Sequence, residues 1–208
     1  VMVESFRAGA VGQRTEDGRE VTPNFNRLMD QGWYVDHHYS NSMQTCKGQF
    51  SFLTSLAPSI RGKEFVRYAH RRLMTLPAVL RDHGYRTVFF QAAEELGFDN
   101  TEEFVRLQGF EIVESAASFA TEEDASHTWG FGLQDDRFYN KFFTHFDRLR
   151  ATSDERPTFA VLATISNHMY FSKVPADRRH LYPEPQNMEQ AYANSVHLSD
   201  RGLAVFFE

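Results

Sequence analysis

The chain has 208 residues, 41% of them hydrophobic and 24% charged, which fits one soluble globular domain with a single sizeable core. The formal net charge is −6 and no long run of Lys or Arg occurs, so the composition argues against a nucleic-acid partner. The only cysteine, Cys46, excludes an internal disulfide, and no apolar run approaches the roughly 18 residues of a membrane span. Because the sequence opens on Val1 inside an apolar run, we expect both ends to have been cut from a longer protein.

Two kinds of hydrophobic pattern alternate along the chain. Short apolar or alternating runs predict strands, in chain order, at residues 1–3, 33–39, 86–91, 110–113 and 159–165. Apolar residues at helical spacing predict helices at residues 22–31, 45–57, 76–83, 101–108, 135–150 and 187–208. Polar or glycine-rich stretches are expected to be loops at residues 8–20, 59–72 and 116–128.

Several of these elements carry specific signals. Thr22 before Pro23 predicts a helix with Thr22 as N-cap, and Gly32 predicts its end. The run 159–165 is continuously apolar, which is typical of a parallel strand covered on both faces. The alternation of strands and helices therefore predicts an α/β fold with a mainly parallel sheet and helices on both faces.

Polar residues follow two of the expected strands. Glu4 ends the first strand, and His168 follows the strand at 159–165. Ligands of parallel sheets bind outside the carboxyl ends of the strands. We therefore expect Glu4, His168 and Thr45 to converge on one cleft.

Thr45 lies where a polar stretch meets the expected helix that ends before Pro58. The free N–H groups and positive dipole end of a helix start favour an anion, so this hydroxyl is a candidate nucleophile toward phosphorus or sulfur. On these residues alone, a simple N-cap role for Thr45 or Ser42 is favoured. Cys46 is the stronger intrinsic nucleophile at this helix start.

His37 and His38 suggest a metal pair. Adjacent residues on a strand point to opposite faces, so we expect structural or surface roles for both.

The ordered set of sequence pieces resembles a known family. VMVESFRA, VTPNFNRLMDQG and YSNSMQTCKGQFSFLTSLAP, followed later by WGFGLQDD, ATISNHMYF and AYANSVHLSDRGLAVFFE, are similar to the sulfatase-like branch of the alkaline phosphatase superfamily. Within this branch they most resemble the lipoteichoic acid synthase and phosphoglycerol transferase group. The resemblance runs over nearly the whole chain, and each piece alone is weak.

The resemblance implies roles for individual residues. Glu4 matches a metal-ligating carboxylate, and Thr45 matches the hydroxyl nucleophile, which also contacts the metal. His168 matches a histidine that contacts the substrate phosphate or its leaving side, and Trp129 lies where an aromatic substrate contact is common. The implied cofactor is one divalent cation, Mn²⁺ or Mg²⁺ first, with Zn²⁺ or Ca²⁺ possible.

The sequence departs from the resemblance in two respects. True sulfatases mature a Cys or Ser within a motif with Pro or Ala two residues on and Arg four residues on. Gly48 and Phe50 occupy those positions after Cys46, which argues against the formylglycine route. The family completes its metal site with an Asp-His pair after a later strand, and the sequence reaches Glu208 before such a strand.

We therefore expect residues 1–208 to be the N-terminal part of one catalytic domain, with no second domain. The implied activity is transfer of phosphoglycerol or phosphoethanolamine from a phospholipid headgroup to a glycan or polyol acceptor through a threonine intermediate. The expected location is outside the cytoplasm, with membrane attachment through segments not in this chain. Two alternatives stay open: a sulfatase-like hydrolase or phosphodiesterase, and a catalytically inert domain that binds a glycan or lipid.

Overall fold

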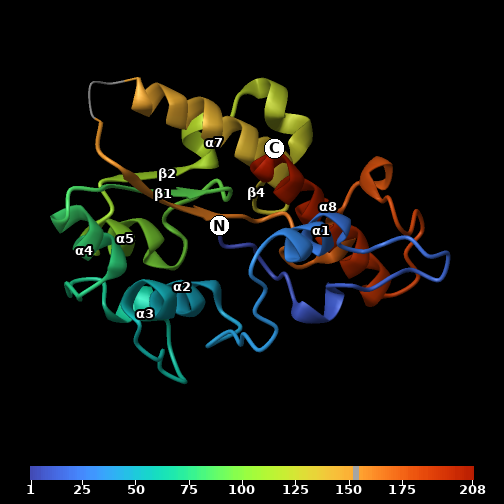
Figure 1. The fold of residues 1–208 in the computed structure, drawn as a ribbon, viewed down its shortest axis with the longest axis horizontal. Helices are drawn as coiled ribbons and strands as arrows, with labels where there is room; N and C mark the ends of the chain where they lie inside the picture. The colour runs from blue at the N-terminus through green and yellow to red at the C-terminus, as the bar shows by residue number, and fades with distance from the viewer. Residues whose placement is uncertain (152–154) are drawn as a thin grey trace.

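The computed structural model describes residues 1–151 and 155–208 (Figure 1). Its main sheet has the strand order β2-β1-β5, built from β1 (Arg86–Gln91), β2 (Ile112–Ser115) and β5 (Thr158–Ala163). Both pairings are parallel, with Phe89 of β1 opposite Val113 of β2 and Val161 of β5. A small antiparallel hairpin joins β3 (Thr128–Trp129) to β4 (Gly132–Leu133). The parallel sheet confirms the predicted fold class.

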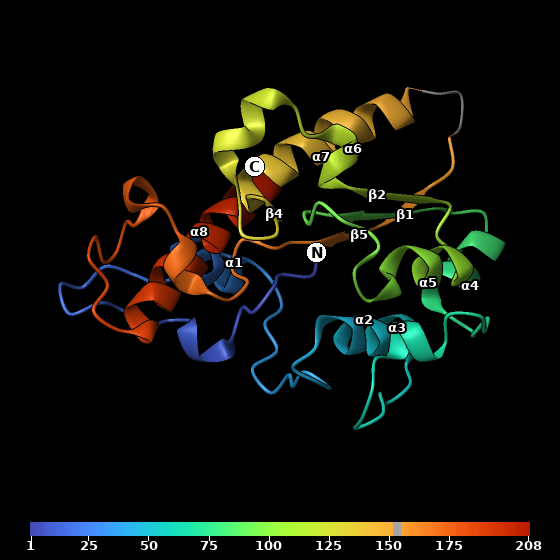
Figure 2. The ribbon, with the colours of Figure 1, turned by 180° about the vertical axis from the view of Figure 1, so that it is seen from behind.

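Helices surround this sheet. The α-helices are α1 (Pro23–Gln31), α2 (Thr45–Thr54), α3 (Glu64–Arg67), α4 (Leu76–Asp82), α5 (Thr101–Leu107), α6 (Ala116–Phe119), α7 (Asp135–Arg150) and α8 (Met188–Phe207). Short 3₁₀ turns are η1 (Ala8–Ala10), η2 (Phe98–Asn100), η3 (Glu122–His127), η4 (Phe171–Lys173) and η5 (Ala176–Arg178). Figure 2 shows α7 on one side of the sheet and α2, α3 and α5 on the other.

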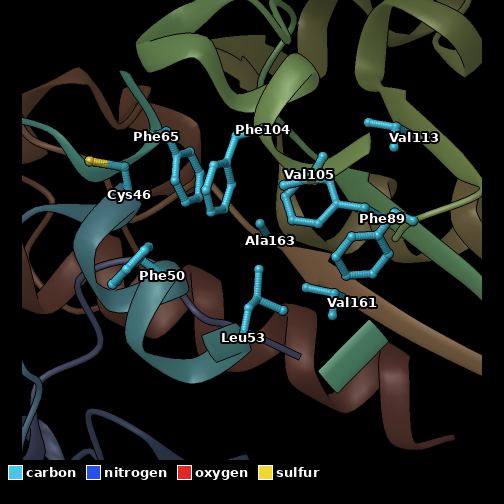
Figure 3. Close-up of a cluster of buried hydrophobic side chains, with 11 residues drawn as sticks. Cys46, Phe50, Leu53, Phe65, Phe89, Phe104, Val105, Val113, Val161 and Ala163 are labelled. Carbon is cyan, nitrogen blue, oxygen red and sulfur yellow. The ribbon is translucent and has the colours of Figure 1, made fainter. Parts of the chain in front are cut away.

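The central strand β1 is buried along its whole length because successive side chains enter two different cores. Phe89 packs with Phe50 and Leu53 of α2, and with Phe104 of α5 (Figure 3). Its neighbour Phe90 packs on the opposite face, in the cluster that contains the buried phenylalanines of α7. Strand periodicity therefore distributes one continuous apolar run over both faces.

Aromatic rings fill much of the core under α2. The rings of Phe65 and Phe104 stack with centroids 4.1 Å apart, and Phe50 stacks on Tyr68 at 5.3 Å. Offset aromatic pairs of this kind stabilise a fold by about 0.5–1.5 kcal/mol beyond their buried area. They hold α2, and with it Thr45, against the sheet.

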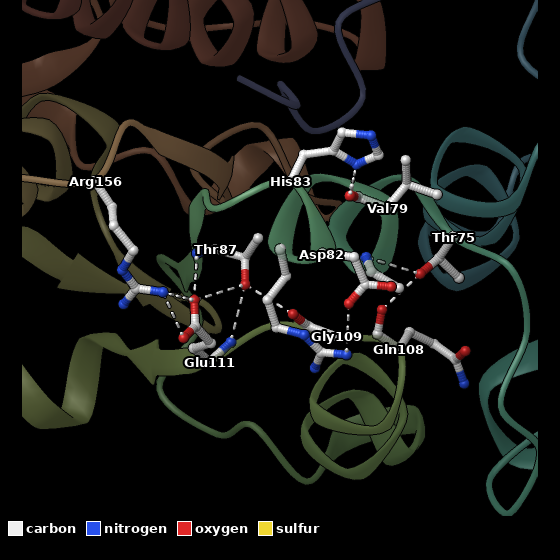
Figure 4. Close-up of polar contacts among 11 residues, drawn as sticks. Thr75, Val79, Asp82, His83, Thr87, Gln108, Gly109, Glu111 and Arg156 are labelled. Atoms are coloured by element: carbon white, nitrogen blue, oxygen red, sulfur yellow. Dashed lines mark hydrogen bonds and ion pairs between the residues drawn. The ribbon is translucent and has the colours of Figure 1, made fainter.

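Polar side chains tie α4 and the α5–β2 connection to the amino end of β1 (Figure 4). Thr87 donates its hydroxyl to the carbonyl of Gly109 at 2.7 Å, and Thr75 donates to the carbonyl of Gln108 at 2.6 Å. Gly109 has a φ of +107°, and a Cβ there would lie 2.8 Å from the backbone of Ala78. A side chain at Gly109 would push α4 away, so this turn requires glycine.

Helix α1 is capped by a residue far away in the sequence. Asp200 of α8 is fully buried, and its carboxylate accepts from the backbone amides of Asn24 at 2.9 Å and Phe25 at 2.7 Å. Thr22 occupies the N-cap position but makes no capping hydrogen bond, so the predicted capping role of its side chain is wrong. A carboxylate at this position also complements the helix dipole.

The remaining differences from prediction concern short segments. Residues 33–39 form no strand: Trp33, Val35 and Tyr39 are exposed and have no ladder partner in the described ranges. Residues 1–3 contribute a single parallel bridge, between Met2 and Ala163. Strand β2 begins two residues later than expected, and α3, α6 and η3 lie in segments predicted to be loops. The alternating pattern of residues 33–39 therefore misled, because no neighbouring strand covers it.

The two adjacent histidines lie in this irregular segment. His37 and His38 are both exposed, which confirms the surface role expected for them. The argument that adjacent strand residues point to opposite faces was wrong here, because the segment is not a strand.

Replacing Asp200 with Ala should destabilise the fold by about 1–3 kcal/mol, because it leaves the amides of Asn24 and Phe25 without their buried acceptor. Urea unfolding followed by circular dichroism measures the loss. Asp30→Ala, at an exposed position of α1, is the control and should shift the urea midpoint little. Equal losses in the two variants would contradict the capping role.

Candidate active site

The first segment of the chain joins the carboxyl end of β5. The amide of Met2 donates to the carbonyl of Leu162 at 2.7 Å, and the amide of Thr164 donates to the carbonyl of Met2 at 3.1 Å. The amide of Glu4 then donates to the Thr164 hydroxyl at 3.0 Å. Glu4 is therefore anchored just beyond the end of β5, at the carboxyl edge of the sheet.

The structure brings Thr45 and Glu4 together, as the sequence predicted. The Thr45 hydroxyl donates to Oε2 of Glu4 at 3.0 Å, and Ser5 donates its hydroxyl to Oε1 at 2.8 Å. Thr45 is exposed and Glu4 is half-buried, so the pair is open to a ligand. The site is thus built from two segments that lie 41 positions apart in the sequence.

Thr45 is the first residue of α2 and not its cap. Gln44 occupies the N-cap position without a side-chain capping bond, while Ser42 only accepts from the Gln44 amide at 3.2 Å. The alternative that Thr45 or Ser42 serves as a simple N-cap is therefore wrong. The amides of Lys47 and Gly48 bond to the carbonyl of Gln44.

The helix start leaves donors available beside the Thr45 hydroxyl. Within residues 1–151 and 155–208, the amides of Thr45 and Cys46 have no protein acceptor. The first amides of an α-helix have no partner inside the helix, and they attract anions. The hydroxyl and the positive end of α2 are therefore next to each other.

Cys46 differs from Thr45 in its surroundings. Its side chain is buried in the core under α2, and burial raises the pKa of its thiol above the ordinary value. A buried thiol with a raised pKa is a poor nucleophile, because the thiolate is the reactive form. The structure therefore favours Thr45 over its neighbour at this helix start.

The oxygens of Glu4, Thr45 and Ser5 match the chemistry of a hard divalent cation, which takes carboxylate and hydroxyl oxygens. In the described part of the chain, no three side chains of His, Cys, Asp or Glu come together as a metal-binding group. The residues present thus fit a divalent cation as part of its coordination shell.

His168 and Trp129, both proposed from sequence as substrate contacts, line one small pocket. Phe131, Tyr170 and Lys173 line it as well, together with the hydroxyl-bearing residues Ser166 and Ser195. Glu4 and Thr45 are not among the residues that line it. Glu4 and Thr45 therefore meet at the start of α2, while His168 and Trp129 lie together in this pocket. The pocket does not include all three residues that were expected to share one cleft.

The imidazole of His168 has a defined orientation. Its Nδ1 lies 2.7 Å from the carbonyl oxygen of Met169, and its ring meets Phe131 edge-on at 4.8 Å. A carbonyl oxygen only accepts, so Nδ1 carries a hydrogen and Nε2 is left for a ligand. His168 is half-buried, so part of its side chain is accessible.

A contact that the sequence did not reveal fixes the segment before His168. The carboxylate of Asp135, at the start of α7, accepts from the amides of Ile165 at 3.2 Å and Ser166 at 3.0 Å. In return, the Ser166 hydroxyl accepts from the Asp135 amide at 2.7 Å. Asp135 directly follows the WGFGLQ piece. In the sequence, an acidic residue in the first turn of a helix indicates only a favourable interaction with the helix dipole, so this contact was not predicted.

Asn167 and Tyr192 connect the two parts of the site. Both donate to the carbonyl of Ser5 at 2.9 Å, Asn167 through its amide nitrogen and Tyr192 through its hydroxyl. Ser5 has a φ of +49°, a conformation that a non-glycine residue adopts only when its surroundings hold it. The sequence indicated only a helix over residues 187–208, so the polar role of Tyr192 was missed.

Replacing Asp135 with Asn should change how the stability of the fold depends on pH. Burial raises the pKa of the Asp135 carboxyl above its ordinary 3.8, although hydrogen bonds from Ser166 and Ile165 oppose the shift. A carboxyl with a raised pKa in the folded state stabilises the fold below the unfolded pKa, and this contribution is lost as pH rises through the folded pKa.

The wild type should therefore lose stability relative to Asp135→Asn as pH rises from about 4. Urea unfolding across this range measures the difference, and Asp136→Asn is the matched control one position along the helix. Parallel stability profiles against pH for wild type and Asp135→Asn would contradict a raised pKa of the Asp135 carboxyl in the folded state.

No helix in the described ranges combines the length and apolar character needed to cross a bilayer.

Known proteins resemble this chain in sequence. The sequence model of the Sulfatase family matches residues 1–208. Lipoteichoic acid synthase 2 of Bacillus subtilis (strain 168) is 25% identical over an alignment of 214 positions, which covers 100% of this chain and 31% of that protein.

Solved structures share the fold. Lipoteichoic acid synthase LtaP from Listeria monocytogenes superposes with a TM-score of 0.87 at 24% identity, over 99% of this chain and 50% of that one. An alkaline phosphatase superfamily protein from Vibrio parahaemolyticus gives 0.81 at 26% identity, over 99% and 48%. The chain thus spans half or less of each of these three proteins. Because the family model matches its whole length, the chain belongs to the sulfatase family and has the alkaline phosphatase-like fold.

Proposed function

We propose that residues 1–208 form the N-terminal part of the catalytic domain of a metal-dependent phosphoglycerol transferase, with Thr45 as its nucleophile. The observation that carries this proposal is the 3.0 Å hydrogen bond from the Thr45 hydroxyl to Glu4 at the start of α2. This contact joins a hydroxyl and a carboxylate beside the free amides at the start of α2, which supports a nucleophilic role for Thr45. The similarity to lipoteichoic acid synthase 2 supports the reaction class.

The hydrogen bond gives the hydroxyl proton of Thr45 an acceptor, Oε2 of Glu4, which increases the negative charge on Oγ1. In the first step, the Oγ1–phosphorus bond forms while the bond from phosphorus to the diacylglycerol oxygen breaks. A glycerophosphoryl-threonine remains, and diacylglycerol leaves with a proton. The amides of Thr45 and Cys46 stabilise the charge on the phosphoryl oxygens.

Glu4 and Thr45 would hold the divalent cation. When bound, such a cation supplies positive charge that favours the deprotonated form of the Thr45 hydroxyl. Mn²⁺ or Mg²⁺ suits these oxygen donors, and histidine ligands from other parts of the protein would admit Zn²⁺. We propose that the remaining metal ligands come from outside residues 1–208, in the part that corresponds to the unmatched portion of the relatives.

The pocket that contains His168 and Trp129 would receive the substrate headgroup. Nε2 of His168 contacts a phosphate oxygen or the leaving oxygen, and the indole of Trp129 packs against the glycerol carbons. In the second step, the hydroxyl oxygen of a glycan or polyol bonds to phosphorus while the Oγ1–phosphorus bond breaks, and the proton of that hydroxyl passes to Thr45. Asp135 acts as a positioning residue, because it holds the segment that carries His168.

The donor in this proposal is a phospholipid such as phosphatidylglycerol, so the reaction takes place at a membrane surface outside the cytoplasm. Attachment to that membrane would come from segments outside residues 1–208. Water in place of the acceptor hydroxyl would turn the same geometry into a hydrolase.

In the full-length protein, Thr45→Ala should lower turnover of phosphatidylglycerol by on the order of 10³-fold or more, because it removes the attacking oxygen. Cys46→Ser should keep most of the activity, because the buried thiol takes no part in the reaction. Release of diacylglycerol measures turnover, and circular dichroism checks that both variants fold. An inactive Cys46→Ser beside an active Thr45→Ala would refute the assignment.

Residues 1–208 alone should bind Mn²⁺ weakly, because one carboxylate and two hydroxyls replace few of the waters around the ion. Titration calorimetry should show a small binding heat that Glu4→Gln removes and that the exposed control Glu16→Gln leaves intact. Tight one-to-one binding by these residues would show instead that the site is complete within them.

A further inference from the structure

Lys173 gives the pocket of Trp129 and His168 a positive charge. No Asp or Glu is among the residues that line this pocket. Across residues 1–151 and 155–208, no carboxylate lies within ion-pair distance of the Lys173 ammonium. An ammonium without a carboxylate neighbour leaves the charge of the pocket uncompensated, which favours an anionic ligand.

The aromatic walls of the pocket hold this ammonium. Nζ of Lys173 lies 4.8 Å from the ring centroid of Phe131 and 5.9 Å from that of Tyr170, both within the range of a cation–π interaction. The Lys173 stem passes over the β3–β4 turn, where a Cβ on Gly130 would lie 3.8 Å from its Cδ. The backbone is fixed too, because the Lys173 amide donates to the Tyr170 carbonyl at 3.1 Å.

These contacts bear on the choice between two headgroups, which the sequence left open. A phosphoethanolamine group carries its own ammonium, which would need an aromatic face or a carboxylate. The faces of Phe131 and Tyr170 are already engaged by Lys173, and the pocket offers no carboxylate. A phosphoglycerol group brings no cation, and its hydroxyls can bond to Ser166 and Ser195.

We propose that Lys173 is a specificity-determining residue that makes the pocket select phosphoglycerol and reject phosphoethanolamine. This inference rests on the function proposed above and narrows its substrate class. The ammonium attracts the phosphate of either ligand, and it repels the ammonium of ethanolamine. Removing the charge weakens binding of glycerol phosphate and also frees two aromatic faces for the ethanolamine cation.

Trp129 itself can report binding. Residues 1–208 contain two tryptophans, and Trp33 is fully exposed, so Trp33→Phe leaves Trp129 as the only indole within them. In this background, sn-glycerol 1-phosphate and phosphoethanolamine are titrated separately while indole fluorescence is followed. The variants are Lys173→Met, which keeps the apolar stem, and Lys173→Arg, which keeps the charge. Arg72→Met removes an exposed cation that does not line the pocket and serves as control.

Wild type and Arg72→Met should bind glycerol phosphate more tightly than phosphoethanolamine. Lys173→Met should lose roughly three- to tenfold in affinity for glycerol phosphate and bind phosphoethanolamine as well as or better than before. Lys173→Arg should restore most of the preference.

An unchanged ratio of the two affinities in Lys173→Met, or a wild type that binds neither ligand, overturns this inference. The turnover assay with Thr45→Ala tests the proposed function separately. Loss of turnover in Thr45→Ala, together with an unchanged affinity ratio in Lys173→Met, would therefore refute the role of Lys173 alone.

Discussion

Burial of β1 on both faces is the constraint on which the rest of the structure depends. Phe89 enters the core under α2, and Phe90 enters the core under α7, so helices must cover each side of the sheet. Parallel strands in such a sheet end at the same edge. The residues that follow β5 therefore lie beside those that follow the first segment, where Met2 pairs with Ala163. The candidate site is a consequence of this shared edge.

The site itself is held by polar contacts of long sequence separation. Asp135 fixes the segment that leads to His168, while Asn167 and Tyr192 fix the carbonyl next to Glu4. Buried hydrogen bonds of this kind are costly to leave unpaired, so each side chain has one favourable arrangement. The backbone beside Glu4 and the segment that leads to His168 are thereby held by groups from distant parts of the chain.

The site divides its tasks between two chemical environments. At the start of α2, oxygen donors and free amides surround Thr45, which suits a cation and a phosphoryl group. In the pocket of Trp129, aromatic rings and Lys173 surround the space near His168. Recognition of a headgroup and attack on its phosphorus would thus rest on different side chains, so substrate choice can change without altering the nucleophile.

The sequence by itself determined the periodicities, and with them the fold class, helix α7 at its observed bounds, and Glu4, Thr45, Trp129 and His168 as candidates. Periodicity and strand-end chemistry are local properties, which is why the sequence reveals them. Only the tertiary structure decided that Asp200 caps α1, that Asp135 holds the segment before His168, and that residues 33–39 have no partner strand. It also decided that Lys173 covers Phe131. These outcomes depend on contacts between residues far apart in the chain, and no local pattern encodes which distant group will supply a hydrogen bond or a neighbouring strand.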